Sequence, residues 1–150
     1  MVKPQHLLVI LVLFAFGCKS GKQSGTDLQP IFTMEKTVCM GPCPSWLFKL
    51  YPNGKVAYAG RENVKLLGNY SAEISKEELS GFRNMLDEAK FFKYANVYSA
   101  NIKDLPTTYL YYDNGEQFSK ITDYYGAPES LKKLEKKIEE FIETIAWKQN

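Results

Sequence analysis

Histidine is almost absent from this sequence. The only one among the 150 residues is His6, in a segment that we expect to be removed from the mature protein. A Ser–His or Cys–His nucleophile system and a histidine-ligated zinc or copper site are therefore excluded from the mature chain. Phosphate-cradling glycine loops and dinucleotide-binding fingerprints are also missing, because the ten glycines are scattered at turns. We predict no catalytic residue, no metal site and no cofactor, and we favour a non-enzymatic role.

An excess of charge of one sign is also missing. Nineteen Lys and Arg residues face seventeen Asp and Glu residues, which gives a formal net charge of +2. No dense basic patch appears in the pattern, so nucleic acid is not expected as a partner. A hydrophobic content of 45% and a charged content of 24% are typical of a globular domain. The aromatic share of 14% favours β-strands, in which aromatic side chains pack well.

The chain has little long hydrophobic sequence apart from one run, Leu7 to Phe16. A helix needs about 20 apolar residues to cross a bilayer, and this run of roughly ten matches the hydrophobic region of a secretory signal. Gly17 and Cys18 follow, and this ending resembles the lipobox of bacterial lipoproteins, in which the cysteine thiol receives a lipid. We predict a signal peptide at 1–17, a lipidated Cys18 with a flexible tether to residue 30, and one domain over 31–150. A plain cleaved signal and an uncleaved anchor are the alternatives.

Hydrophobic periodicity predicts the elements of that domain. Alternation with period two begins at Ser45, and two Asn-Gly turns, at Asn53 and Asn114, indicate hairpins. Ser75 and Glu78 form a capping box ahead of an apolar stripe with helical spacing. The order β-β-β-α-β-β-α predicts an α+β fold, an antiparallel sheet of about five strands with two helices packed on one face. Strands are expected over 45–51, 55–60, 64–74, 107–113 and 116–122, and helices over 76–90 and from Pro128 onward.

Cys39 and Cys43 are left as a pair once Cys18 carries lipid, and three interpretations compete for them. The first is a structural disulfide, since thiols oxidise outside the cytoplasm and the Gly-Pro between them allows a tight loop. The second is thiol-redox work, although a β-patterned segment rather than an activating helix follows Pro44. The third is Cu(I) binding by two thiolates. We favour the disulfide.

Asp104, Tyr109 and Tyr111 are the candidate ligand-binding residues. Asp104 precedes a Leu-Pro turn, where an aspartate serves as a ligand or general base, or simply caps the turn. Tyr109 and Tyr111 alternate along a predicted strand, which produces either an aromatic binding face or ordinary cross-strand packing. For all three residues the structural interpretation is the simpler one.

Several of these segments together resemble an uncharacterised bacterial family, domain of unknown function 6438. The resemblance runs from about residue 37 to 147 and is carried by Cys39-Met-Gly-Pro-Cys-Pro44, Asp104-Leu-Pro106 and Tyr125-Gly-Ala-Pro128. It implies a domain that is often exported or lipid-anchored, with Cys39, Cys43 and Asp104 as shared positions, and it implies no known reaction.

We therefore expect a bacterial lipoprotein of the cell envelope, facing the periplasm or the cell exterior. Its partners would be the membrane, through the lipid anchor on Cys18, and a protein of the envelope. The expected role is a non-enzymatic binding or assembly module with a Cys39–Cys43 disulfide. The alternative is a thiol-redox or Cu(I)-handling protein that uses the same two cysteines.

Overall fold

The structure is a computed structural model that describes residues 28–150. The predicted signal peptide, the lipidation site Cys18 and nearly all of the tether lie outside the described residues. Within residues 28–150, neither helix is long and apolar enough to cross a membrane.

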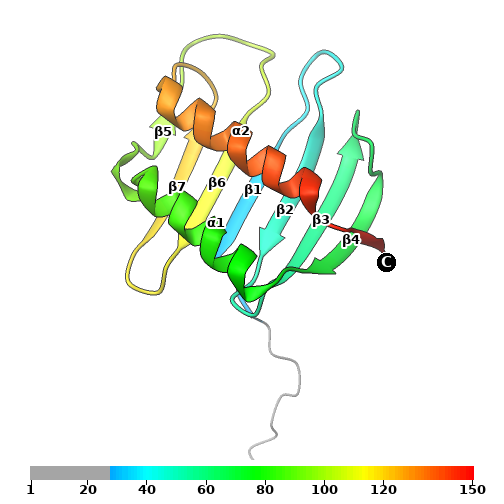
Figure 1. Ribbon diagram of the computed structural model, residues 1–150. Helices are drawn as coiled ribbons and strands as arrows, with labels where there is room; N and C mark the ends of the chain where they lie inside the picture. Colours follow the sequence, from blue (N-terminus) through cyan, green and yellow to red (C-terminus); the bar gives the residue numbers. More distant parts are fainter. Residues whose placement is uncertain (1–27) are drawn as a thin grey trace, which may run out of the picture.

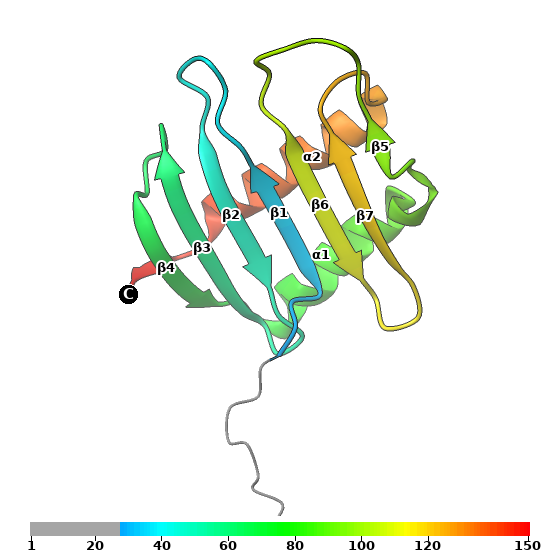
Figure 2. The ribbon, with the colours of Figure 1, turned by 180° about the vertical axis from the view of Figure 1, so that it is seen from behind.

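An eight-stranded sheet forms one layer, and two α-helices cover one of its faces (Figures 1 and 2). The strand order across the sheet is β5-β7-β6-β1-β2-β3-β4-β8, and every neighbouring pair is antiparallel except β5 and β7. The strands are β1 (Phe32–Lys36), β2 (Ser45–Leu50), β3 (Lys55–Glu62), β4 (Gly68–Glu73), β5 (Val97–Tyr98), β6 (Thr108–Asp113), β7 (Phe118–Asp123) and β8 (Lys148–Gln149). The helices are α1 (Lys76–Glu88), the short 3₁₀ helix η1 (Phe91–Lys93) and α2 (Glu129–Thr144).

The hydrophobic core lies between the sheet and the two helices. Alternate residues of each central strand point into it, as their burial pattern shows for Phe32, Phe48 and Tyr112. Phe82 of α1 packs edge-on against Phe32, with ring centroids 4.9 Å apart. The opposite face of the sheet is left without a covering helix (Figure 2). The predicted α+β class with both helices on one face is therefore confirmed.

The predicted number of strands, about five, is too low, because β1, β5 and β8 were missed. β1 has only two buried apolar residues, Phe32 and Met34, which is too short a pattern to separate from a tether. It nevertheless lies at the centre of the sheet, between β2 and β6. β5 and β8 have two residues each and acquire their strand geometry only by pairing with β7 and β4. Such short edge strands carry no periodicity of their own.

The third predicted strand is also shorter than expected. Residues 64–67 form a connection, and β4 begins at Gly68, which has a φ of +99° that favours glycine. The capping box of α1 is confirmed, since the Glu78 amide donates to Ser75 Oγ at 3.1 Å and the Ser75 amide donates to Glu78 Oε2 at 2.7 Å. The carboxylate's hydrogen bonds with Ser75 lower the pKa of Glu78.

The connections of the sheet divide between its two ends (Figures 1 and 2). The chain enters β1 at one end, and the two Asn-Gly hairpins turn at that same end. The β1–β2, β5–β6 and β7–α2 connections gather at the opposite end. We call this group of loops the tip, and it comprises residues 37–44, 99–107 and 124–128.

Candidate functional site

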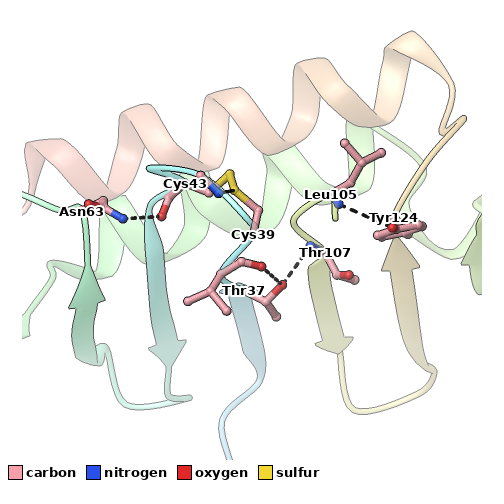
Figure 3. The surroundings of a disulfide bond; sticks show 9 residues. Thr37, Cys39, Cys43, Asn63, Leu105, Thr107 and Tyr124 are labelled. Carbon is pink, nitrogen blue, oxygen red and sulfur yellow. Dashed lines mark hydrogen bonds between the residues drawn. A yellow bond between two sulfur atoms is a disulfide. The ribbon is translucent and has the colours of Figure 1, made fainter. Parts of the chain in front are cut away.

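A disulfide between Cys39 and Cys43 closes the β1–β2 loop of the tip (Figure 3). The two Cα atoms are 5.7 Å apart, within the usual range for a disulfide, so the predicted pairing is present in the structure. The Gly41 amide donates to Cys39 Sγ at 3.2 Å. β2 begins at Ser45, so a strand and not a helix follows the second cysteine. The disulfide thus fixes how the chain turns from the central strand into its neighbour.

Hydrogen bonds tie this closed loop to the connections on either side (Figure 3). The Thr37 amide donates to the Thr107 carbonyl at 3.0 Å, and the Thr107 amide donates to Thr37 Oγ1 at 2.9 Å. Asn63 Nδ2 donates to the Cys43 carbonyl at 3.1 Å. The Tyr124 hydroxyl donates to the Ile102 carbonyl at 2.6 Å. Loops from distant parts of the sequence therefore form one connected surface.

Large apolar side chains are exposed on that surface. Met40 is 83% exposed, and Val38 beside it is about half exposed. The β5–β6 loop adds Ile102 and Leu105, and the β7–α2 connection adds Tyr125, all of them exposed. Exposed apolar side chains on loops that hydrogen bonds hold in place are typical of an interaction surface.

The three predicted ligand-binding residues are not brought together. Asp104 lies on the tip, exposed, with a φ of +70°, a left-handed conformation that aspartate tolerates better than most residues. Tyr109 and Tyr111 lie on β6, on the sheet face that no helix covers. Tyr109 is exposed, while the Tyr111 hydroxyl donates to Asp113 Oδ2 at 3.2 Å. Burial and this hydrogen bond raise the pKa of Tyr111.

A cavity of about 430 Å³ lies beneath the tip, between its loops and α2. Cys43, Pro44, Leu105 and Pro106 contribute its outer wall, so the Cys-Pro and Leu-Pro segments meet there. Its inner wall is charged and includes Lys36, Asp123, Lys132 and Glu135.

Two carboxyl groups are buried in the inner wall. Asp123 at the end of β7 is 1% exposed, and Glu135 on α2 is 5% exposed. Lys132 Nζ forms an ion pair with Asp123 Oδ2 and lies 3.5 Å from Glu135 Oε2. The other oxygen of each carboxyl group has no nitrogen or hydroxyl donor among the described residues.

The pKa of Glu135 indicates that these two carboxyl groups share a proton. Burial, followed by a hydrogen bond with Asp123, raises the pKa of Glu135 to about 8. Glu135 is therefore mostly protonated at neutral pH, and its proton is available for the hydrogen bond with Asp123, which pairs with Lys132 on its other side. Sequence reasoning missed both acids. The signal for Glu135 was available, because it lies one residue after Leu134 and three before Ile138, on the buried stripe of α2.

A comparison with protein-family models matches residues 30–142 to the domain of unknown function DUF6438. The chain belongs to this family. The matched segment begins just before β1 and ends within α2, so the DUF6438 domain includes β1, which the resemblance drawn from the sequence left out. It also contains the whole tip and both buried acids. No curated protein matches the chain.

Proposed function

We propose that this DUF6438 protein is a lipid-anchored binding module of the bacterial cell envelope, and that its tip binds a partner protein. The observation that carries the proposal is the group of exposed apolar side chains on the tip, led by Met40 and Val38. Exposure of these apolar side chains to water is unfavourable. A partner that buries them therefore gains hydrophobic free energy.

The placement of the tip supports this role. The chain enters β1 at the end of the sheet opposite the tip (Figure 1). A lipid on Cys18 and the tether that follows would hold that entry end toward the membrane. The tip would then point away from the bilayer, at a distance set by the length of the strands, roughly 3.3 Å for each residue. A partner could reach the apolar side chains without contacting lipid.

The Cys39–Cys43 disulfide has a structural role in this proposal. It holds Met40 within a short closed loop, with Val38 directly before it, so that less conformational entropy is lost when a partner binds. The alternative, thiol-redox or Cu(I) chemistry at the same cysteines, needs a reactive thiolate. The segment after Cys43 is Pro44 and then β2, which offers no helix N-terminus to stabilise one.

Site-specific crosslinking in cells tests the proposal. A photoreactive amino acid at Met40 should give a discrete protein adduct in the envelope fraction. The same amino acid at Asn53, which is exposed in the hairpin at the opposite end, is the matched control and should give none. Equal adducts from both positions, or adducts from neither, would contradict binding through the tip.

The membrane anchor has a separate test. Cys18→Ser should lose lipid labelling and shift from the membrane fraction to the soluble envelope fraction, since a lipid is the proposed attachment. Membrane association that survives this substitution would refute the anchor while leaving the tip as a binding surface open to the crosslinking test.

A further inference from the structure

A second and larger cavity, of about 640 Å³, lies beside the tip, between the C-terminal half of α2 and the connection from β3 to β4. Pro44 lines both this cavity and the one beneath the tip. The volume of the larger cavity falls within the range of about 300–1,000 Å³ that is usual for small-molecule sites. Neither the partner binding proposed for the tip nor the buried acids gives this larger cavity a role.

Three aromatic side chains line this cavity: Trp46, Tyr58 and Trp147. The rings of Trp46 and Tyr58 are stacked with centroids 5.9 Å apart, and those of Tyr58 and Trp147 are 5.6 Å apart. Trp147 Nε1 donates to the Ile142 carbonyl at 3.1 Å, which fixes the indole against the end of α2. The faces of such rings carry a negative electrostatic potential that attracts cations.

The hydroxyl of Tyr58 is available to a ligand. The side chain is only 8% exposed, and it lines the cavity. The hydroxyls of Tyr98, Tyr111 and Tyr124 form hydrogen bonds within the protein, whereas that of Tyr58 has no such partner in residues 28–150. Burial and the neighbouring Tyr70 raise the pKa of Tyr58, so its hydroxyl stays neutral. The Tyr58 oxygen is not among the buried side-chain atoms that lack a partner, so it reaches solvent at the cavity and is open to a ligand.

Charges of both signs line the cavity. Glu139 and Glu143 of α2 line it, and α2 has no basic residue in its last turn. The negative end of the helix dipole therefore lies beside two carboxylates, an arrangement that costs stability in the empty protein. Glu139 pairs with Lys36, while Glu143 has no ion pair in the described part of the chain. Lys65, exposed on the opposite wall, opposes this negative potential.

We infer that this cavity binds an organic cation, an alkylated ammonium group with an apolar body. The aromatic rings would contact the cation and its carbon substituents, and the Glu143 carboxylate would supply the opposite charge at the rim. This inference does not depend on the proposed binding of a protein at the tip.

Intrinsic fluorescence gives a direct test, because the only two tryptophans of the chain, Trp46 and Trp147, both line the cavity. The purified full-length protein is titrated with choline chloride and with its uncharged isostere, 3,3-dimethylbutan-1-ol, at constant ionic strength. Choline should change the fluorescence in a saturable way, and the alcohol should bind at least about fivefold more weakly because it lacks the charge. Equal affinities, or no saturable change with choline, would overturn the inference.

Substitutions of the charged residues at the rim of the cavity show whether negative charge there favours choline binding. Glu143→Gln should raise the Kd for choline about threefold to tenfold, and Lys65→Gln should lower it by a similar factor. Glu140→Gln, on the same helix but outside the cavity lining, is the matched control and should change the Kd little. Weaker choline binding in Lys65→Gln would contradict electrostatic attraction of a cation at this site and would refute the inference.

Discussion

Asp123 and Glu135 face each other as two buried carboxyl groups beneath the tip, one at the end of β7 and one on α2. Lys132 forms an ion pair with Asp123, and the raised pKa of Glu135 keeps this second carboxyl group mostly protonated at neutral pH. Two isolated carboxylates could not both remain ionised at this depth without a large free-energy cost. The shared proton therefore stabilises the packing of α2 against the end of β7, from which the β7–α2 connection of the tip begins.

The first prediction concerns the pH dependence of stability. The pKa of Glu135 is raised to about 8 in the folded protein, from the usual value of 4.5. Between these values the folded state keeps a proton that the unfolded chain has lost, so the free energy of unfolding should fall as the pH rises through this window. Glu135→Gln keeps a hydrogen-bond donor at every pH. It should be more stable than the wild type by on the order of 3 kcal/mol at pH 8.5, and by little at pH 5.

Urea unfolding of both proteins from pH 5 to pH 9 measures this difference. Glu140→Gln is the control, because Glu140 is exposed on the same helix and its pair with Lys136, at 3.8 Å, contributes little to stability. A stability difference between wild type and Glu135→Gln that stays constant with pH would contradict the shared proton.

The second prediction concerns Lys132, the cation beside the two acids. Lys132→Met removes the positive partner of Asp123 and should lower the free energy of unfolding by roughly 2 kcal/mol, reduced from the value for a fully buried pair because Lys132 is partly exposed. In an Asp123→Asn background the same substitution should cost less than about 0.5 kcal/mol, since no buried charge is left unpaired. Chemical denaturation of the four proteins completes this double-mutant cycle, and equal costs in both backgrounds would show that the pair does not couple.

The contrast between the two acids shows what the sequence could reveal about the site. Glu135 lies on the apolar stripe of α2, with Leu131, Leu134 and Ile138, so helical spacing alone predicts its burial. Asp123 shares the buried face of β7 with Ile121, but that strand offers no other buried residue to establish the alternation. Its meeting with Lys132 and Glu135 depends on how α2 crosses the sheet, which no local pattern determines.

The same distinction applies to the fold. The hairpins and helices follow from local rules, namely Asn-Gly turns, a capping box and periodic apolar residues, and they were predicted. β1 is held in the sheet by its pairing with two other strands, β2 on one side and β6 on the other, and its own residues do not predict this pairing. The tip could not be predicted either, because it consists of loops that only this topology brings together.

The third prediction concerns Gly60, where β3 passes close to the connection that follows it. A Cβ atom at this position would lie 1.7 Å from the Leu66 carbonyl oxygen, so the backbone of the connection would have to move. Gly60→Ala should therefore destabilise the protein by roughly 3 kcal/mol.

Gly81→Ala is the matched control. An added Cβ there meets no atom within 4 Å, and alanine in the middle of α1 should stabilise the protein by about 0.5–1 kcal/mol. Thermal unfolding of the two variants should shift in opposite directions, and parallel shifts would contradict the close contact at Gly60.

The fourth prediction separates a structural disulfide from a working thiol pair. Replacing both Cys39 and Cys43 by alanine should lower the free energy of unfolding by about 2 kcal/mol, the value expected for so short a loop. The substitution should leave the sheet intact but weaken crosslinking through Met40, because the loop that holds Met40 would no longer be closed. Mass spectrometry with thiol labelling should find the native pair oxidised and resistant to a cytosol-like glutathione buffer, since structural disulfides of exported proteins resist that pool. A pair that is reduced readily, or that is isolated with copper bound, would instead support redox or Cu(I) chemistry at these cysteines.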